Sequence, residues 1–346
     1  MFMKRLGVAA ALMLCAFGAA ASNFRAADQV YLPISGHAAG ATGVFITDVY
    51  ISNLSTDAVT VSVIFMSRVA NVGGGNDPGE DLTTRIELAA NERKELLDIF
   101  PNTFGKPAEV PIVGQLIFNA CKKDADCGPA SQNSAGFSAN FRPISVMSRI
   151  YQIPNNAGAT PPTTGQDLPG VPWYSFISSL QQDVNLDKAF ITGFTHNGNP
   201  GQAGTYRSNV GIVNASQYSS TQVVARLYKN SLSETNKIAE RAVDLGPLGN
   251  IQQGLSDLFP GIFPAQFGSN FFVTFEQRNN VATENAPIDC LQGCPAFLVY
   301  GSVLDNASGD ATTLESQYFI EMDPAALAAL YPNGSGKGVL RRMVRK

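Results

Sequence analysis

The segment GVFITDVYISN at residues 43–53 occurs again, in diverged form, as GTYRSNVGIVN at residues 204–214. The two segments align without a gap, with four identical residues and three close replacements. Within the first segment the side chains alternate, so that Ile51 would point to one side of a sheet and Asp48 to the other. This alternation is typical of a half-buried strand, and its recurrence predicts a duplicated β domain.

The repeat extends well beyond this strand. Four landmarks in the same order predict a tandem repeat of roughly 160 residues. The first landmark pairs His37 with His196. The other three pair VSVIF at 61–65 with the region 223–228, LLDIFP at 96–101 with LSDLFP at 255–260, and PISVMSRIYQ at 143–152 with PAFLVYGSVLDN at 295–306.

Composition favours the same class of fold. Charged residues make up only 15% of the chain, and 32 glycines and 20 prolines separate short runs of β-branched and aromatic residues. This mixture is typical of many short strands joined by turns. We therefore predict an all-β protein with two tandem antiparallel immunoglobulin-like β-sandwich domains and minor short helices. The expected domains are residues 22–175 and 176–322, followed by a short helix and a basic flexible tail at 323–346.

The N-terminus predicts export. Residues 1–21 combine a positive start, an apolar run and a small-residue cleavage site, which is the pattern of a secretory signal peptide. The apolar run is too short to span a bilayer, and no later segment is long and apolar enough to do so. We expect a secreted, periplasmic or cell-surface protein.

Four cysteines fall as close pairs at corresponding places in the two halves, Cys121 with Cys127 and Cys290 with Cys294. In an exported chain such pairs favour disulfides. Zinc is the alternative, but the spacings differ from C-x2-C and no histidine is near in the sequence. We predict two local disulfides, each closing a short loop.

The sequence also resembles a family. The pattern LP…H…G…TD…I…N, then SRxY…GQ, then SVxDNxSGD is similar to β-sandwich repeats of exported bacterial proteins, mostly of unassigned function. The resemblance covers nearly the whole mature chain and implies the fold and export, but no reaction. Departures are Ile46, where a basic residue such as Arg207 is common, and Asn209 in place of aspartate. The residues that carry it are His37, Thr47, Asp48, Asn53, Ser148, Arg149, Tyr151, Gly165, Gln166, Asp305, Asn306, Gly309 and Asp310.

His37 and His196 are the two histidines of the chain, and they occupy corresponding places that we expect to be Gly-rich loops. A Ser-His-Asp hydrolase could use one of them, but the chain has no G-x-S-x-G segment. Bonding to a neighbouring backbone group is the favoured role.

Asp48 and Arg149 each lie inside an otherwise apolar strand. A buried or edge ion pair, or an arginine bonded to turn carbonyls, would explain them, and contact with a ligand is the alternative. Together with the two histidines they are the possible binding residues. Trp173, at the junction of the halves, is expected to pack between them.

The segment DNASGDATTLE at 305–315 offers Asp305, Asn306 and Asp310 as oxygen ligands for calcium. It fails the EF-hand spacing, so a turn closed by side-chain bonds is favoured. We predict no metal and no cofactor.

A net charge of −4 argues against a general nucleic-acid binder. The basic residues Arg341, Arg342, Arg345 and Lys346 are expected to form a solvated tail rather than to bind an anionic surface. We therefore predict a secreted non-enzymatic protein, a cell-surface, matrix, or ligand- or protein-binding module. Its partner would be an unknown protein or surface polymer, and self-association through sheet edges is a further option. The alternative is a secreted hydrolase with an unrecognised active site.

Overall fold

The computed structural model describes residues 26–40, 43–67, 81–122, 142–155, 163–172, 175–176, 188–215, 220–281 and 296–318. Several predictions fall outside these residues, and so they stay predictions. They concern the signal peptide at 1–21, Trp173, three of the four cysteines (Cys127, Cys290 and Cys294), and the helix and basic tail at 323–346. Cys121 is the buried last residue of a strand, and both disulfide pairings remain to be tested.

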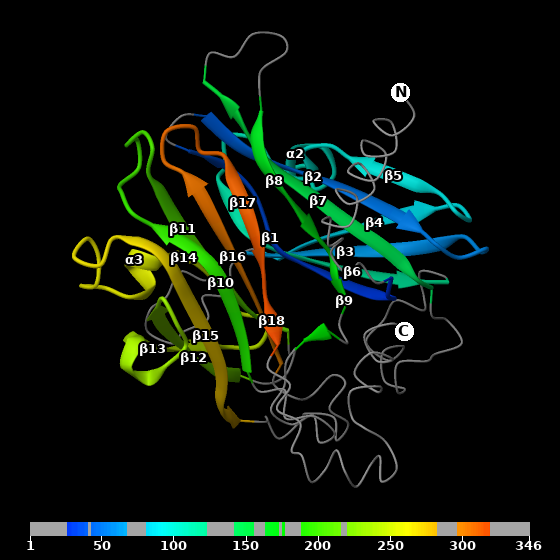
Figure 1. Ribbon diagram of the computed structural model, residues 1–346. Helices are drawn as coiled ribbons and strands as arrows, with labels where there is room; N and C mark the ends of the chain where they lie inside the picture. The colour runs from blue at the N-terminus through cyan, green and yellow to red at the C-terminus, as the bar shows by residue number, and fades with distance from the viewer. Residues whose placement is uncertain are drawn as a thin grey trace, which may run out of the picture.

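The all-β prediction is confirmed (Figure 1). The first half contains β1 (Gln29–Ala39), β2 (Gly43–Asn53), β3 (Val59–Ser67), β4 (Asp81–Leu88), β5 (Arg93–Leu96), α2 (Ile99–Asn102), β6 (Ile112–Cys121), β7 (Ile144–Pro154), β8 (Thr164–Pro169) and β9 (Val171–Pro172). The second half contains β10 (Lys188–His196), β11 (Tyr206–Asn214), β12 (Ser220–Lys229), the 3-10 helix η4 (Glu234–Asn236), β13 (Lys237–Leu245), β14 (Asn250–Gly254), α3 (Leu255–Leu258), β15 (Gly268–Val281), β16 (Phe297–Asp305), β17 (Ala311–Glu315) and β18 (Gln317–Tyr318).

The strand pairing of the first half recurs in the second. A four-stranded sheet has the order β5-β2-β7-β8 in the first half and β14-β11-β16-β17 in the second. A five-stranded sheet has the order β4-β3-β6-β1-β9 in the first half and β13-β12-β15-β10-β18 in the second. All these pairs are antiparallel. In the first half, the end of β1 also pairs with the start of β2 and links the two sheets. The exact domain limits stay a prediction.

Each half buries its own apolar core between its two sheets. Val49 and Ile51 on β2 are fully buried in the first core, and Val210 and Ile212 on β11 are fully buried in the second. The alternation in the two copies of the segment therefore correctly predicts which side chains face a core. The two pieces LLDIFP and LSDLFP contain the short helices α2 and α3, which also occupy corresponding places.

A third apolar cluster, which we call the joint, has buried members from both halves. The alternation of side chains along β6 shows how the joint forms. Leu116 and Phe118 face the first core, whereas Ile117 between them belongs to the joint. Strands of this kind are buried on both faces. The buried members of the joint are Tyr31, Ile34, Ile117, Leu168, Phe176, Val213, Leu298 and Tyr300.

In the second half, the joint uses the outer face of the four-stranded sheet. On β16, Leu298 and Tyr300 belong to the joint, while Val299 faces the second core. The ring of Tyr300 lies against Gly211 on β11, where an added Cβ atom would come within 2.4 Å of three of its atoms. Only glycine leaves room for this ring.

Polar contacts also cross between the halves. The buried side-chain amide of Gln115 donates to the carbonyl of Leu248 at 2.6 Å. The carboxylate of Asp310 accepts from the backbone N–H of Gly165 at 3.2 Å, and the hydroxyl of Thr313 donates to the carbonyl of Asp167 at 3.1 Å. The GQ and SGD segments of the sequence pattern thus meet at the boundary between the halves.

Candidate functional site

The outer face of the first four-stranded sheet carries the candidate site, and we call it the β2–β7 face. Because Val49 and Ile51 point inward, Asp48 and Tyr50 point outward. Across the sheet, Arg149 on β7 lies directly opposite Asp48 on β2 and opposite Asp167 on β8. The half-buried side chains on this face are those of Tyr50, Met147, Arg149 and Tyr151.

Asp48 is only 5% exposed although it lies on the outer face, because the segment before α2 covers it. The backbone N–H of Asp98 donates to Asp48 Oδ1 at 2.8 Å, and the hydroxyl of Tyr151 also hydrogen bonds to the Asp48 carboxylate. A buried carboxylate needs such donors to stabilise its charge. Asp48 therefore fixes the position of Tyr151 on the β2–β7 face.

Asp98 connects this carboxylate to His37. Its carboxylate Oδ1 lies 3.0 Å from Nδ1 of His37, which is 6% exposed. Asp98 has a left-handed backbone (φ 40°), which is uncommon for a residue with a side chain and which often marks functional segments. The structure thus brings together three of the residues singled out from the sequence, His37, Asp48 and Arg149.

The prediction that the histidines lie in loops is wrong. His37 lies in β1 opposite Ile112, and His196 is the last residue of β10. The glycines that suggested a loop include Gly36, where an added Cβ atom would approach the carbonyl oxygen of Ile112 to 2.9 Å. Glycine there permits close strand packing rather than a turn.

Arg149 makes two contacts with the described part of the chain. Its guanidinium donates to the hydroxyl of Thr163 at 2.9 Å, and it lies over the ring of Tyr151, 4.8 Å from the centroid. Although Asp48 and Asp167 flank it across the strands, its described contacts include no ion pair with either. Among the described residues, the ion-pair interpretation from the sequence therefore does not describe Arg149.

The pKa of Tyr151 gives a test of this arrangement. Burial, the charge of Asp48 and the hydrogen bond to Asp48 raise this pKa from 10.0 to about 12. Asp48→Asn is expected to lower it toward the ordinary value, as measured by NMR titration of ¹³C-labelled tyrosine. Because the folded state holds the proton more tightly than the unfolded state, this contribution to stability is present below pH 10 and is lost as the pH rises toward 12. An unchanged Tyr151 pKa in the variant would contradict the contact.

The equivalent face of the second half does not carry this cluster. On β11 and β16, Asn209 lies opposite Ser302, where the first half has Asp48 opposite Arg149. Leu304 then takes the place of Tyr151. This second face includes joint residues such as Leu298 and Tyr300, so the duplicated surface docks the halves in one copy and carries a polar cluster in the other.

His196 cannot act as a general base in the geometry observed. Its Nδ1 accepts a hydrogen bond from the backbone N–H of Ser208 at 3.2 Å, so the proton of the neutral ring is on Nε2. That nitrogen lies 2.8 Å from the hydroxyl of Ser256 and donates to it rather than accepting its proton. Burial lowers the pKa of His196 and favours this neutral form, although Asp257 opposes the shift. The backbone-bonding role predicted from the sequence describes His196.

The segment 305–310 forms a turn closed by side chains. Asp305 Oδ1 accepts from the backbone N–H groups of Ala307 and Ser308, at 2.9 and 2.7 Å, and these bonds lower the pKa of its carboxyl. Asn306 Oδ1 accepts from Arg207, and Asp310 Oδ1 accepts from Gly165 across the halves. Within the described ranges, no group of three or more His, Cys, Asp or Glu side chains could hold a metal ion.

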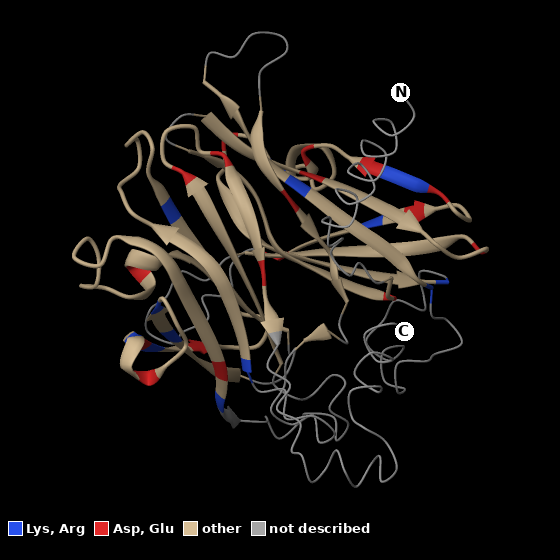
Figure 2. Ribbon diagram, viewed as in Figure 1, with Lys and Arg blue, Asp and Glu red and all other residues tan. Residues whose placement is uncertain are grey.

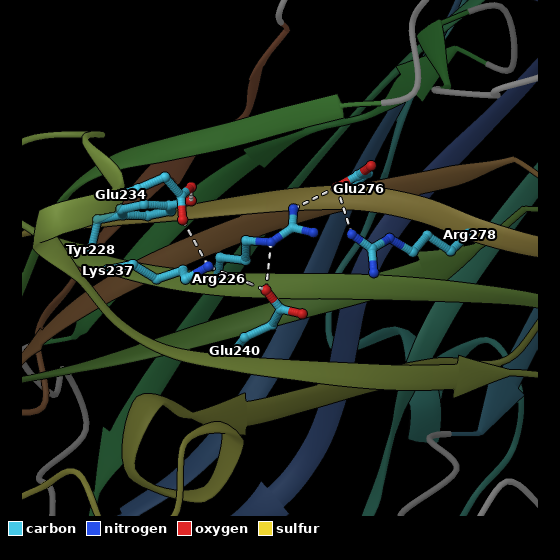
Figure 3. Close-up of polar contacts among 7 residues, drawn as sticks. All are labelled: Arg226, Tyr228, Glu234, Lys237, Glu240, Glu276 and Arg278. Carbon is cyan, nitrogen blue, oxygen red and sulfur yellow. Dashed lines mark hydrogen bonds and ion pairs between the residues drawn. The ribbon is translucent and has the colours of Figure 1, made fainter.

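The outer face of the second five-stranded sheet carries a network of alternating charges (Figure 3). Arg226 pairs with Glu240 and Glu276, Glu276 also with Arg278, and Lys237 with Glu234 and Glu240. Figure 2 shows these charges clustered on β12, β13 and β15. Each charged side chain of this network forms an ion pair with a side chain of opposite charge, so the charges of the network neutralise one another.

Comparisons with known proteins leave the function open. No family model matches the sequence, and no curated protein matches it. Among solved structures, the B domain of a biofilm-associated protein shares 11% identity, with 85% of this chain and 81% of that chain covered, at a TM-score of 0.21. The BSP domain of a biofilm-associated protein shares 10% identity, with coverage of 92% and 64% and a TM-score of 0.21. A broad bean stain virus structure shares 10% identity, with coverage of 89% and 95% and a TM-score of 0.25.

At these TM-scores the likenesses carry no argument, and the fold rests on the sheets themselves. No helix in the described part of the chain is long and apolar enough to cross a membrane. The family resemblance in the sequence pattern stays a prediction.

Proposed function

We propose that this protein is an exported, non-enzymatic binding module that engages a macromolecular partner through the β2–β7 face. The observation that carries the proposal is the divergence between the two copies of one surface. In the second half this surface docks onto the first half, whereas in the first half it carries Arg149 and Tyr151 in fixed positions. A scaffold that keeps its fold but changes one face is typical of a change in what that face binds.

Three properties of the β2–β7 face favour recognition over catalysis. It is the face of a sheet, so its side chains are held by strand pairing rather than by a mobile loop. Its half-buried residues Tyr50, Met147, Arg149 and Tyr151 are of the types enriched in protein interfaces. The charged groups beneath it, Asp48 and Asp98, are engaged by hydrogen bonds.

The hydrolase alternative has less support. The described surroundings of His196 place its proton toward Ser256, which is the wrong direction for activating a serine. His37 contacts the carboxylate of Asp98, which belongs to the chain of contacts beneath the β2–β7 face. Roles in holding structure account for both histidines.

The test compares binding of the mature protein to washed cells of the exporting organism and to their extracellular material. Met147→Lys places a long charged side chain on the β2–β7 face and is expected to reduce binding about tenfold or more, because interface residues at a packed centre dominate affinity. Thr83→Lys is the matched control: it adds the same charge at an exposed position on β4, in the other sheet of the same half, and should bind as wild type does.

Binding that is equal in all three proteins would refute the proposal, provided that circular dichroism shows each variant to be folded. A panel of hydrolase substrates tests the alternative. Turnover that is lost in the variant carrying both His37→Ala and His196→Ala would favour the enzyme.

A further inference from the structure

We infer that the group recognised on the β2–β7 face is a carboxylate presented by a partner protein, and that Arg149 binds it. This inference rests on the proposed function, because it identifies the chemistry of the same surface.

Arg149 is poised for such a contact because its charge is not satisfied by a carboxylate in the described part of the protein. Arg93, on the same face, is different: its guanidinium lies 3.1 Å from Glu95. Arg149 instead donates from one nitrogen to the hydroxyl of Thr163 and lies over the ring of Tyr151. A guanidinium held in this way still offers further N–H donors, and a carboxylate matches their geometry with two parallel hydrogen bonds.

A series of contacts fixes Arg149 from the interior outward. Buried His37 contacts Asp98, and the backbone of Asp98 donates to Asp48. Asp48 holds the hydroxyl of Tyr151, whose ring supports the guanidinium of Arg149. Because the arginine is already ordered, binding a partner costs little further loss of side-chain freedom.

The arrangement of the rings favours a protein over a polysaccharide. A sugar ring stacks on a free aromatic face, but Arg149 covers one face of Tyr151 and Arg93 covers one face of Tyr50, at 4.8 and 5.1 Å from the centroids. Arginine and tyrosine are, with tryptophan, the residues enriched at the energetic centres of protein interfaces. Moreover, the equivalent face of the second half, with Leu298 and Tyr300, already docks onto a protein sheet.

A second copy of this chain does not supply the carboxylate. If the copies stacked as the two halves do, the β2–β7 face would meet the outer face of the second five-stranded sheet. The carboxylates Glu234, Glu240 and Glu276 on that face are already paired with Lys237 and Arg226, so they would have to break these pairs (Figure 3). The corresponding face of the first half, which the second half covers, carries the apolar residue Ile64 next to the joint. An apolar residue there can pack against another sheet without breaking an ion pair. The partner is therefore a different protein.

The decisive experiment measures binding to the washed cell material for Arg149→Gln and for Arg85→Gln as the matched control. Both substitutions remove one positive charge from the first half, but Arg85 is exposed on β4, in the other sheet. Loss of a two-bond arginine–carboxylate contact is expected to weaken binding about tenfold or more in Arg149→Gln, whereas Arg85→Gln should change it by less than about twofold. Amidation of the carboxylates on the material with a carbodiimide and an amine, and separately its digestion with protease, should each abolish binding of the wild-type protein.

The outcomes separate the two proposals. If Met147→Lys abolishes binding but Arg149→Gln and amidation do not, the β2–β7 face binds and the carboxylate inference is wrong. Binding that resists protease but is lost after periodate oxidation would identify an acidic polysaccharide and overturn the protein partner. If wild type and Met147→Lys bind alike, the proposed function itself fails. Wild-type protein that self-associates through this face would also overturn the inference.

Discussion

Ile212→Ala is expected to lower the free energy of unfolding by about 2–5 kcal/mol, and Ile51→Ala by a similar amount. Both side chains are fully buried, at the same place in the second and first cores. Truncation removes three methyl or methylene groups from water-free packing and leaves a cavity that the paired strands on either side cannot easily fill. Chemical denaturation followed by circular dichroism measures the change.

Two exposed leucines serve as controls. Leu54, just after Ile51, is 52% exposed, and Leu232 in the second half is 37% exposed. Leu54→Ala and Leu232→Ala should each change the free energy of unfolding by less than about 0.5 kcal/mol. If Ile51→Ala were as mild as Leu54→Ala, the assignment of β2 to the first core would be wrong.

Much of the fold could be predicted because its determinants are local and occur twice. The alternation in residues 43–53 sets which side chains face a core, and the burial of Ile51 and Ile212 confirms it. The repeated landmarks also coincide with the two short helices, although the sequence did not predict a helix at the second one. The joint could not be predicted, because Tyr31 and Ile117 are neighbours of core residues in sequence and nothing local shows that their own side of the sheet is covered.

The candidate site was predictable in part. Charged residues inside apolar strands drew attention to Asp48 and Arg149, and the repeated position drew attention to His37. The connection among them depends on Asp98, which comes from a segment 50 residues away from Asp48 and has a left-handed backbone. Sequence reasoning met Asp98 only as part of the LLDIFP landmark, whose aspartate recurs as Asp257. A recurring polar residue within an apolar landmark was the signal that could have identified it.

The joint also changes the thermal behaviour expected of the two halves. Two tandem domains, as the sequence predicts, should melt separately unless their interface is large and apolar. The structure shows eight buried apolar side chains in the joint, together with hydrogen bonds such as that from Gln115 to Leu248. We therefore expect the halves to unfold in one coupled transition, which both Ile51→Ala and Ile212→Ala lower.

Removing the joint should restore independent unfolding. Tyr300 and Leu298 are 6% and 3% exposed and face the first half, while their neighbour Val299 faces the second core. The variant carrying Leu298→Ala and Tyr300→Ala is expected to lose about 5 kcal/mol or more, taking the two truncations together, chiefly from the coupling between the halves.

Calorimetry of this joint variant should resolve two transitions, with Ile51→Ala lowering one of them and Ile212→Ala the other. A wild-type protein that already shows two transitions, each sensitive to one mutation, would contradict the coupling.

The coupling also affects binding. While the joint is intact, the second half restrains the first half and limits its movement. The β2–β7 face, whose sheet contacts the second half through β8, then keeps its arrangement while it binds. A joint variant that is folded but binds the washed cell material more weakly would show that recognition depends on this support, because the substituted side chains lie outside the β2–β7 face.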